Sequence, residues 1–431
     1  MPLTQNDFIA IEDETIIASA PPRRHRAFPT GVRLPDGDIL VGFRIGSDHH
    51  MTHDGAFYLA RSSDNGRHWT PPKVLAAYPG WDVCAVLGQY PDGVLPEQEP
   101  FLWARLMMYR WIANPTKDED YRTYQTLWTL SYDYGHNWEL PFPLYTQGFN
   151  RVDTDRGAFV LGGLNPHSYS TTLIRLSDNT TLGMFTGNKE LMKYRKAAEL
   201  RNSGQTLHAL TEMPLAGFSK DNLKSWRYVV VADPDEYNVG FSESDIVQLA
   251  SGRIVAVYGN NQRSRWFWRT YSDDEGRTWA KMKQLTFRGD SPSMVALADG
   301  TLLVAFRNAP ETGPMGIGVA VSTDHGESWR HLGNLRDQGG WDMGYPDLVK
   351  MADGNFLCVY YTAAEDKYIP GSLSEKLAQQ EPMRAMRLQM RPRLYEELNG
   401  EIRAFILRDL TLTGSTVREN RESDTQDKVE L

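Results

Sequence analysis

The sequence lacks the features that mark several protein classes. Its two cysteines, Cys84 and Cys358, have no metal-like spacing. No apolar run approaches the roughly 18 residues of a membrane-spanning helix. The net charge of −9 gives no basic footprint for nucleic acid. We therefore expect no metal or other cofactor, no nucleic-acid partner and no membrane insertion.

A secretory signal is also missing from the N-terminus. The opening stretch, MPLTQNDFIAIEDET, has no basic segment followed by an apolar one. The low cysteine count fits a reducing compartment. The simplest expectation is a cytoplasmic protein, although a chain from which a signal had been removed would look the same.

What the chain does contain is a repeated frame, Ser-x-Asp-x-Gly-x-x-Trp, which we call the box. Roughly one chain in a thousand of this length would contain a single match by chance. Several copies are therefore a true repeat. A worn copy, SKDNLKSW at 219–226, has Leu223 in place of Gly. The complete copies are SSDNGRHW at 62–69, SYDYGHNW at 131–138, SDDEGRTW at 272–279 and STDHGESW at 322–329.

The box predicts a tight turn between two strands. Its Asp can accept hydrogen bonds from backbone amides two residues on, and its Gly supplies a positive φ at low cost. Its Trp can bury the indole ring against a neighbouring hairpin. We interpret the boxes as structural elements rather than as catalytic ones.

A second turn recurs as x-Asp-Gly between apolar runs. Flanks such as those in GVRLPDGDILVGF are typical of β-hairpins. After five of these turns a box follows, with its Asp 23 to 43 residues further on. The spacing predicts six four-stranded sheets, of which the sixth has no box. The turns are LPDG (Asp36), YPDG (Asp92), LSDN (Asp178), LASG (Ser251), LADG (Asp299) and MADG (Asp353).

The boxes resemble the Asp-box repeats of the sialidase superfamily, over about residues 26–412. The resemblance implies an all-β fold, a six-bladed β-propeller with short helical insertions. We expect one propeller domain over residues 1–412 and a polar, mobile tail over 413–431.

The remaining segments are assigned by their composition. Residues 188–212 and 370–392 have helix-forming composition, and 94–122 is expected to be an insertion that carries the aromatic Trp103. The segment 402–410, IRAFILRDL, is the candidate closing strand of the sixth blade. The run 8–18 could pair at the seam of the ring, and a closed ring leaves few exposed sheet edges.

The inner strands of a propeller run along its central channel. Residues at a fixed distance before each x-Asp-Gly turn should therefore face one shared mouth. A buried strand normally begins with apolar residues, so polar groups there point to a binding site. The residues eight positions before the turns are Phe28, Cys84, Ser170, Glu243, Ser291 and Tyr345.

Two of these positions match the catalytic pair of sialidases. By resemblance, Tyr345 in GYPDLVKMADG is the nucleophilic Tyr, and Glu243 in SESDIVQLASG is the Glu that takes its proton. A phenol has a pKa near 10 and is a poor nucleophile until a base activates it. Tyr nucleophiles are a known exception among glycosidases. The alternatives are a channel-packing Tyr and a structural partner of an Arg.

The acid/base residue of the family lies in a loop that corresponds here to residues 44–55. Asp48 and Asp54 are both candidates, and His53 lies nearest to the family's position. A His side chain suits proton transfer near neutral pH. A metal site and a plain polar loop are the alternatives for this stretch.

The arginine clamp of sialidases is matched incompletely. Arg26 stands three residues before Pro29, one out of phase with the family, and one residue changes the face of a strand. The second arginine position falls on Gly259, and the stretch for the third has no Arg. Arg44 and Arg307 could reach the mouth or form salt bridges. The other candidates for substrate contact are Asp82, Asp290, His167 and Trp103.

These observations favour a carbohydrate-active enzyme. The leading hypothesis is an exo-acting glycoside hydrolase on a short oligosaccharide, with an acidic, deoxy or other non-sialic sugar open as substrate. The alternatives are a lyase on uronic-acid glycans and a non-catalytic propeller that binds sugar or protein. The sequence gives no indication of the oligomeric state.

Overall fold

Almost all of the structure that can be described is β-strand. The only helix among the described residues is the single turn α4 (Pro234–Tyr237), and no helix there is long and apolar enough to span a membrane. The all-β expectation is therefore confirmed. The computed structural model describes residues 9–18, 25–47, 53–90, 101–112, 121–143, 145–146, 172–188, 212–260, 265–297, 299–312, 314–338, 343–351, 353–361, 383–390, 394–396 and 402–404.

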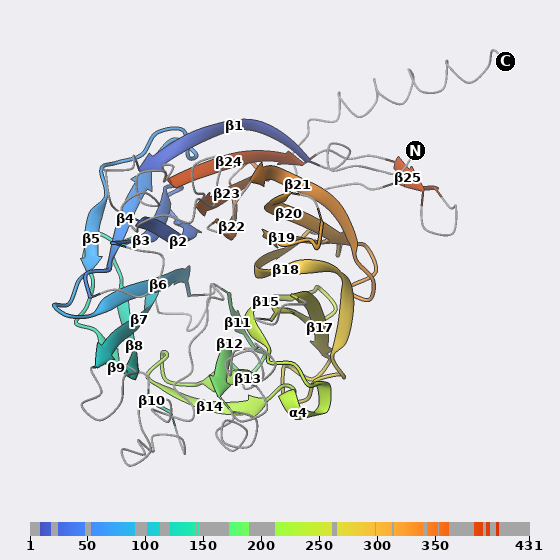
Figure 1. The fold of residues 1–431 in the computed structure, drawn as a ribbon, viewed down its shortest axis with the longest axis horizontal. Helices are drawn as coiled ribbons and strands as arrows, with labels where there is room; N and C mark the ends of the chain where they lie inside the picture. Colours follow the sequence, from blue (N-terminus) through green and yellow to red (C-terminus); the bar gives the residue numbers. More distant parts are fainter. Residues whose placement is uncertain are drawn as a thin grey trace.

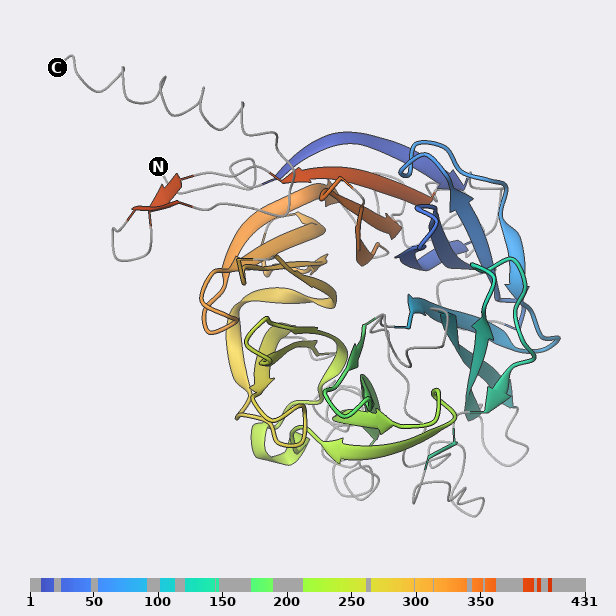
Figure 2. The same cartoon turned by 180° about the vertical axis from the view of Figure 1, so that it is seen from behind.

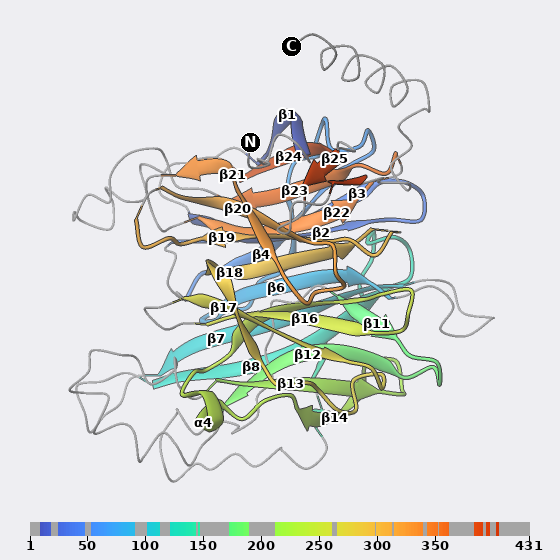
Figure 3. The same ribbon diagram turned by 90° about the vertical axis from the view of Figure 1, so that its right-hand side faces the viewer.

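The described strands form six antiparallel groups of four, arranged as blades around a ring (Figure 1). Seen edge-on, the ring is a stack of nearly parallel ribbons (Figure 3). Blade one contains β2 (His25–Arg33), β3 (Ile39–Gly46), β4 (Ala56–Ser62) and β5 (Lys73–Ala76). Blade two contains β6 (Asp82–Gln89), β7 (Leu102–Ile112), β8 (Tyr121–Ser131) and β9 (Phe142–Pro143). Blade three contains β11 (Leu173–Arg175), β12 (Thr181–Asn188), β13 (Glu212–Ser219) and β14 (Ser225–Val230), with β10 (Tyr145–Thr146) parallel to β14.

One long strand is shared by two blades. The first residues of β18 (Lys283–Ala296) pair with β17, and the residues from Gly289 onward pair with β19. Blade four contains β15 (Ser242–Gln248), β16 (Ile254–Gly259), β17 (Trp266–Ser272) and the start of β18. Blade five contains the rest of β18, β19 (Leu302–Asn308), β20 (Met315–Ser322) and β21 (Arg330–Gln338). Blade six contains β22 (Gly344–Lys350), β23 (Phe356–Tyr361), β24 (Met383–Met390) and β1 (Ile9–Ala18).

The N-terminal strand closes the ring. β1 pairs with β24 from Ile9↔Met390 to Ala18↔Met383, which confirms the expected pairing at the seam. Of the expected closing strand 402–410, only β26 (Ile402–Ala404) is described; among the described strands it pairs with β25 (Leu394–Glu396) alone, so the assignment is wrong for these residues, and β1 takes the outer position of blade six. This two-stranded ribbon projects from the ring (Figure 2).

Two expected insertions are instead blade strands. Residues 383–390, within the segment expected to be helical, form β24, because pairing with both β1 and β23 overrides local helix preference. Within 94–122, residues 102–112 form β7 and 121–122 begin β8, while 94–100 and 113–120 lie outside the described residues. The segment 189–211, with its expected helix, and the tail 413–431 lie outside the described residues.

The boxes form the turns expected of them, with hydrogen bonds that reach further along the chain. In the four complete boxes one Asp oxygen accepts the amide four residues on, at 2.8 Å, rather than two residues on. The Ser hydroxyl accepts the Gly amide at 2.8 or 2.9 Å. The worn copy folds in the same way, with the Leu223 amide 3.1 Å from the Ser219 hydroxyl and a positive φ of 68° at Leu223.

Each box also packs against the preceding blade. A Cβ at Gly66 would lie 2.8 Å from Leu357 of blade six, and one at Gly326 would lie 2.7 Å from Val255 of blade four. Both glycines have positive φ, 81° and 85°. The glycines are thus required by the turn and by the close approach of neighbouring blades.

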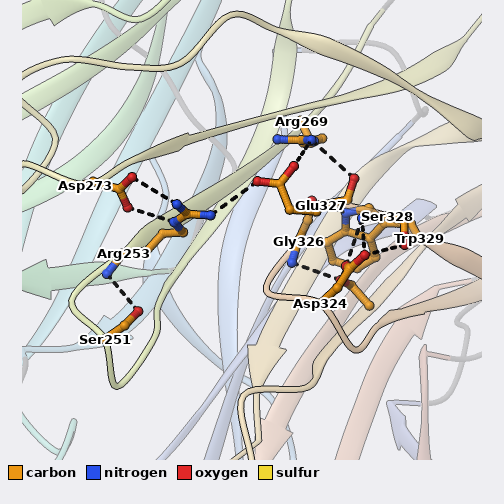
Figure 4. A network of polar contacts seen from close by, with 10 residues as sticks. Ser251, Arg253, Arg269, Asp273, Asp324, Gly326, Glu327, Ser328 and Trp329 are labelled. Atoms are coloured by element: carbon orange, nitrogen blue, oxygen red, sulfur yellow. Dashed lines mark hydrogen bonds and ion pairs between the residues drawn. The ribbon is translucent and has the colours of Figure 1, made fainter.

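On the box side of the ring, ion pairs join blades four and five (Figure 4). Arg253 donates to both oxygens of Asp273, at 2.7 and 3.0 Å, and to Glu327 at 3.3 Å. Arg269 also donates to Glu327.

Successive strands of a blade are antiparallel, so the x-Asp-Gly turns and the boxes share one end of the blades. The heads of the inner strands lie at the opposite end.

Candidate active site

Four inner strands begin with a bulge. The residues Phe28, Glu243, Ser291 and Tyr345 have positive φ, between 40° and 55°. The strand register shifts beside each of them. A bulge re-aims a side chain out of the strand alternation, and such backbone outliers cluster at functional sites. These bulges are the local reason that the strand heads converge on one mouth.

The hydroxyl of Tyr345 donates a hydrogen bond to Oε1 of Glu243, across the mouth from blade six to blade four. We call these two residues the Tyr–Glu pair. Both are half-buried. The ring of Phe28 meets the Tyr345 ring edge-on at 4.8 Å, and the Arg307 guanidinium lies 5.1 Å from the Tyr345 ring centre. The tyrosine is therefore held on two sides while its hydroxyl meets the acid.

Ser291 connects the Tyr–Glu pair to a second carboxylate. Its hydroxyl lies 2.8 Å from Oε2 of Glu243 and 3.3 Å from Oδ1 of Asp290. Both oxygens of Glu243 thus have hydroxyl partners, Tyr345 on one and Ser291 on the other. This arrangement fixes the orientation of the Glu243 carboxyl.

Two arginines bind Asp290. Arg307 Nη1 donates to Oδ1 at 2.8 Å, and Arg265 Nη1 donates to Oδ2 at 2.7 Å. Arg307 also donates to the Tyr361 hydroxyl at 3.1 Å and to the Met343 carbonyl. The side chains of Asp290 and Arg307 are 4% and 8% exposed, whereas that of Arg265 is 35% exposed. Arg265 is the one of the three that solvent reaches readily.

The surroundings change the acidity of the Tyr–Glu pair. Burial, followed by the nearby charge of Asp290, raises the pKa of Glu243 to about 7. Burial and the neighbouring Glu243 raise the pKa of Tyr345 well above its ordinary value. A carboxyl with a pKa near 7 is matched to proton transfer at neutral pH. A cavity of about 20 Å³, enough for one water molecule, is lined by Glu243, Ser291, Tyr345 and neighbouring residues.

Arg44 and Asp82 are bound to each other. Arg44 Nε and Nη2 each lie 2.6 Å from an Asp82 oxygen, and both side chains are almost fully buried, at 2% and 1% exposed. The pair joins blade one to the first strand of blade two. A Cβ at Gly55 would lie 2.0 Å from Asp82 Oδ1, so only glycine fits beside this pair. Neither side chain is accessible to a substrate, so the salt-bridge alternative is confirmed for Arg44, and the expected substrate contact of Asp82 is wrong.

Two other expected contacts are also buried. Trp103 is fully buried in β7, where its ring meets Trp128 edge-on at 5.3 Å, so the prediction that it stacks on a sugar is wrong. Arg26 is 6% exposed, and burial lowers the pKa of its guanidinium to about 10. The sequence suggested that Arg26, one residue out of phase with the family, would face the wrong side of its strand. That argument fails as well, because the bulge between Ala27 and Thr30 breaks the alternation of side chains along β2.

The loop expected to carry the acid lies at the start of β6. The amide of Val83 donates to the Gly55 carbonyl at 3.0 Å, which ties the loop end to that strand. His53 and Asp54 are exposed, and Asp54 Oδ1 accepts hydrogen bonds from the Ser47 amide and hydroxyl at 3.1 and 2.9 Å. Their acid/base role stays a prediction.

Two candidates, Asp48 and His167, lie outside the described residues. Within the described segments, no group of three His, Cys, Asp or Glu side chains could hold a metal ion.

Two residues of the mouth received no role from the sequence. Ser291 stood among the inner-strand heads without an assigned partner, and Arg265 was not among the predicted site residues. Phe28, Ser291 and Tyr345 each precede a proline. The residue before a proline ordinarily favours extended backbone with negative φ, so this pattern did not predict the positive φ of these residues.

A ring of antiparallel blades, repeated boxes and a Tyr–Glu pair at the strand heads together define a β-propeller of the sialidase superfamily. A family model described as BNR repeat-like domain matches residues 100–358, and the chain belongs to that family. A sialidase from Paraclostridium sordellii is 26% identical over 203 residues, and the match covers 38% of this chain and 50% of the relative. The chain thus spans about half the length of this curated relative.

Solved structures share the fold. A protein of unknown function from Dyadobacter fermentans is 18% identical, with a TM-score of 0.65, over 89% of this chain and 99% of that chain. The intramolecular trans-sialidase from Ruminococcus gnavus is 12% identical, with a TM-score of 0.54, over 90% and 98% of the two chains. At these identities the likeness concerns the fold alone.

Proposed function

We propose that the protein is a glycoside hydrolase that removes a terminal sugar, with the Tyr–Glu pair as its reacting centre. One observation carries the proposal. The phenol of Tyr345 donates a hydrogen bond to a Glu243 carboxyl whose pKa is raised to about 7. Similarity to the sialidase from Paraclostridium sordellii supports a glycan as substrate.

The proposed reaction has two steps. Glu243 takes the phenolic proton while the Tyr345 oxygen attacks the anomeric carbon, and an acid in the 48–54 loop protonates the leaving oxygen. Water then attacks the same carbon and gives one proton back to the residue of the 48–54 loop, which now acts as a base, while the bond to the Tyr345 oxygen breaks and Glu243 returns the phenolic proton. Splitting one difficult displacement into two easier ones is the advantage of a covalent intermediate.

A screen of chromogenic glycosides and uronic-acid polymers tests the proposal. We expect the wild type to release the aglycone of at least one glycoside, and Tyr345→Phe to lose more than about 100-fold in kcat, since removing a nucleophile removes transition-state bonding. Tyr132→Phe, which removes the hydroxyl of a tyrosine that is 52% exposed and lies in a box at the opposite end of the blades, is the matched control and should retain full activity.

The other outcomes are informative. A new ultraviolet absorbance from uronic-acid polymers would identify a lyase in place of the hydrolase. A protein that binds glycans but cleaves none, with Tyr345→Phe indistinguishable from the wild type, would be a non-catalytic propeller.

A further inference from the structure

The mouth contains an anion, Asp290, that two arginines already bind. Asp290 accepts from Arg307 at 2.8 Å and from Arg265 at 2.7 Å, so each of its oxygens has a guanidinium partner. We propose that Asp290 is a resident anion that makes the site select neutral sugars, glycosides without a carboxylate on the anomeric carbon. This inference rests on the proposed function and adds its substrate class.

The position of Asp290 supports this role. Ser291 lies within 3.3 Å of Asp290 and 2.8 Å of Glu243, so a single side chain separates the resident anion from the Tyr–Glu pair. Arg307 lies over the Tyr345 ring and is bound to Asp290 at the same time. A sugar carboxylate that turned to Arg307 or Arg265 would have to compete with Asp290, which already accepts from one nitrogen of each, and it would meet a like charge there.

The backbone keeps Asp290 in place. A Cβ at Gly259 would lie 3.1 Å from the Cα of Asp290, so a longer side chain at position 259 would meet this backbone. Position 259 is where the resemblance to sialidases expects the second arginine. The chain has the Asp290 backbone where that arginine would need space.

The other arginines of the mouth do not replace the clamp. Arg44 holds Asp82 through two contacts of 2.6 Å in a buried pair. Arg26 is 6% exposed. Arg265 reaches solvent, at 35% exposed, with one nitrogen committed to Asp290. The described mouth therefore offers a neutral substrate hydroxyl groups and the edge of Arg265, but no open guanidinium pair.

The wild type can be tested without any mutation. The 4-methylumbelliferyl glycoside of N-acetylneuraminic acid is compared with a panel of neutral 4-methylumbelliferyl pyranosides. We expect kcat/KM for the best neutral glycoside to exceed that for the sialoside by at least about 100-fold, equal to roughly 2.7 kcal/mol. A sialoside within tenfold of the best neutral glycoside would overturn the inference.

Binding separates this inference from the proposed function, because it needs no turnover. Calorimetry with N-acetylneuraminic acid and its methyl ester should show that the wild type binds the acid no more tightly than the ester. Acid binding at least tenfold tighter than ester binding contradicts the resident anion. If the wild type cleaves no glycoside, the hydrolase proposal fails, and this comparison still decides the role of Asp290.

The variant Asp290→Asn should gain the affinity for an acidic sugar that the wild type lacks. Without the resident charge, the exposed Arg265 becomes available to a ligand carboxylate, and the positive charge of the buried Arg307 is no longer offset, so affinity for N-acetylneuraminic acid should rise at least tenfold. Glu327→Gln is the matched control, since Glu327 also lies between two arginines but at the opposite end of the blades. It should leave acid affinity unchanged, and no gain in a folded Asp290→Asn variant refutes the inference.

A second variant covers the case in which Asp290→Asn does not fold, which a thermal melt would reveal. Arg265→Gln leaves the Asp290–Arg307 contact intact and removes the exposed guanidinium. We expect it to leave the weak affinity for N-acetylneuraminic acid unchanged. A tenfold loss of that affinity would show that Arg265 already binds a substrate carboxylate and would contradict the inference.

Discussion

The buried pair of Arg44 and Asp82 should carry a large share of the stability around the mouth. Asp82→Asn removes the negative charge while keeping the shape of the side chain. The Arg44 guanidinium, 2% exposed, would then be a buried cation without its carboxylate partner. Breaking a buried pair in this way costs about 3–5 kcal/mol.

Urea denaturation monitored by tryptophan fluorescence measures this loss. Lys220→Gln is the control, because the Lys220–Asp178 pair spans 3.2 Å with side chains 73% and 42% exposed. Exposed pairs contribute about 0–1 kcal/mol, so the control should change stability little. A loss below about 1 kcal/mol for Asp82→Asn, similar to the control, would refute the claim that this pair holds blades one and two together.

Three further predictions concern the reacting pair, the worn box and a mistaken sugar contact. Because a base must be ionised, activity should rise with pH through about 7, the pKa of Glu243, and a profile flat from pH 5 to 8 would contradict that assignment. Replacing Leu223, which is fully buried at a φ of 68°, by Gly relieves strain of about 1 kcal/mol but loses burial worth about 1.5–3 kcal/mol. Net destabilisation of about 1 kcal/mol is expected in a denaturant titration, and a stabilised variant would show that strain dominates. Trp103→Phe should lower the melting temperature without changing KM for any glycoside, whereas a raised KM with unchanged stability would restore its role in sugar binding.

The repeat determined most of the fold from the sequence. Boxes and x-Asp-Gly turns are local signals, because each depends on a few neighbouring residues: the Asp or Ser accepts nearby backbone amides, and the Gly supplies the positive φ. They located the hairpins of blades one to five and placed Glu243 and Tyr345 at equivalent strand heads. The contact between these two residues was implied by the resemblance to sialidases, and the repeat added only that both stand at equivalent strand heads.

Features that depend on distant segments were predicted less well. The segment 383–390 becomes a strand because β1 and β23 flank it, and no local pattern encodes those two partners. The same limit applies to Arg44 and Asp82, which are 38 residues apart in sequence. Each reads as a polar mouth residue by position, and only their mutual contact shows that both are withdrawn from a substrate.

The phase of Arg26 illustrates a different limit. Counting residues along a strand assumes strict alternation, and the bulge after Ala27 breaks it.

Trp103 was assigned to an exposed insertion because the even spacing of blades is interrupted there. The chain instead uses part of that length for the long strands β7 and β8, and the Trp103 indole packs on the face of this sheet in a buried cluster with Trp128 and Trp226.

The most direct test of the account is to look for a sugar attached to Tyr345. The wild type is mixed with its best chromogenic glycoside, quenched with acid within milliseconds and digested for mass spectrometry. The account predicts a peptide containing Tyr345 whose mass is increased by one glycosyl residue, and no such peptide from Tyr345→Phe. An active enzyme whose peptides stay unmodified under conditions that show a burst of aglycone, or one modified at another residue, would contradict it.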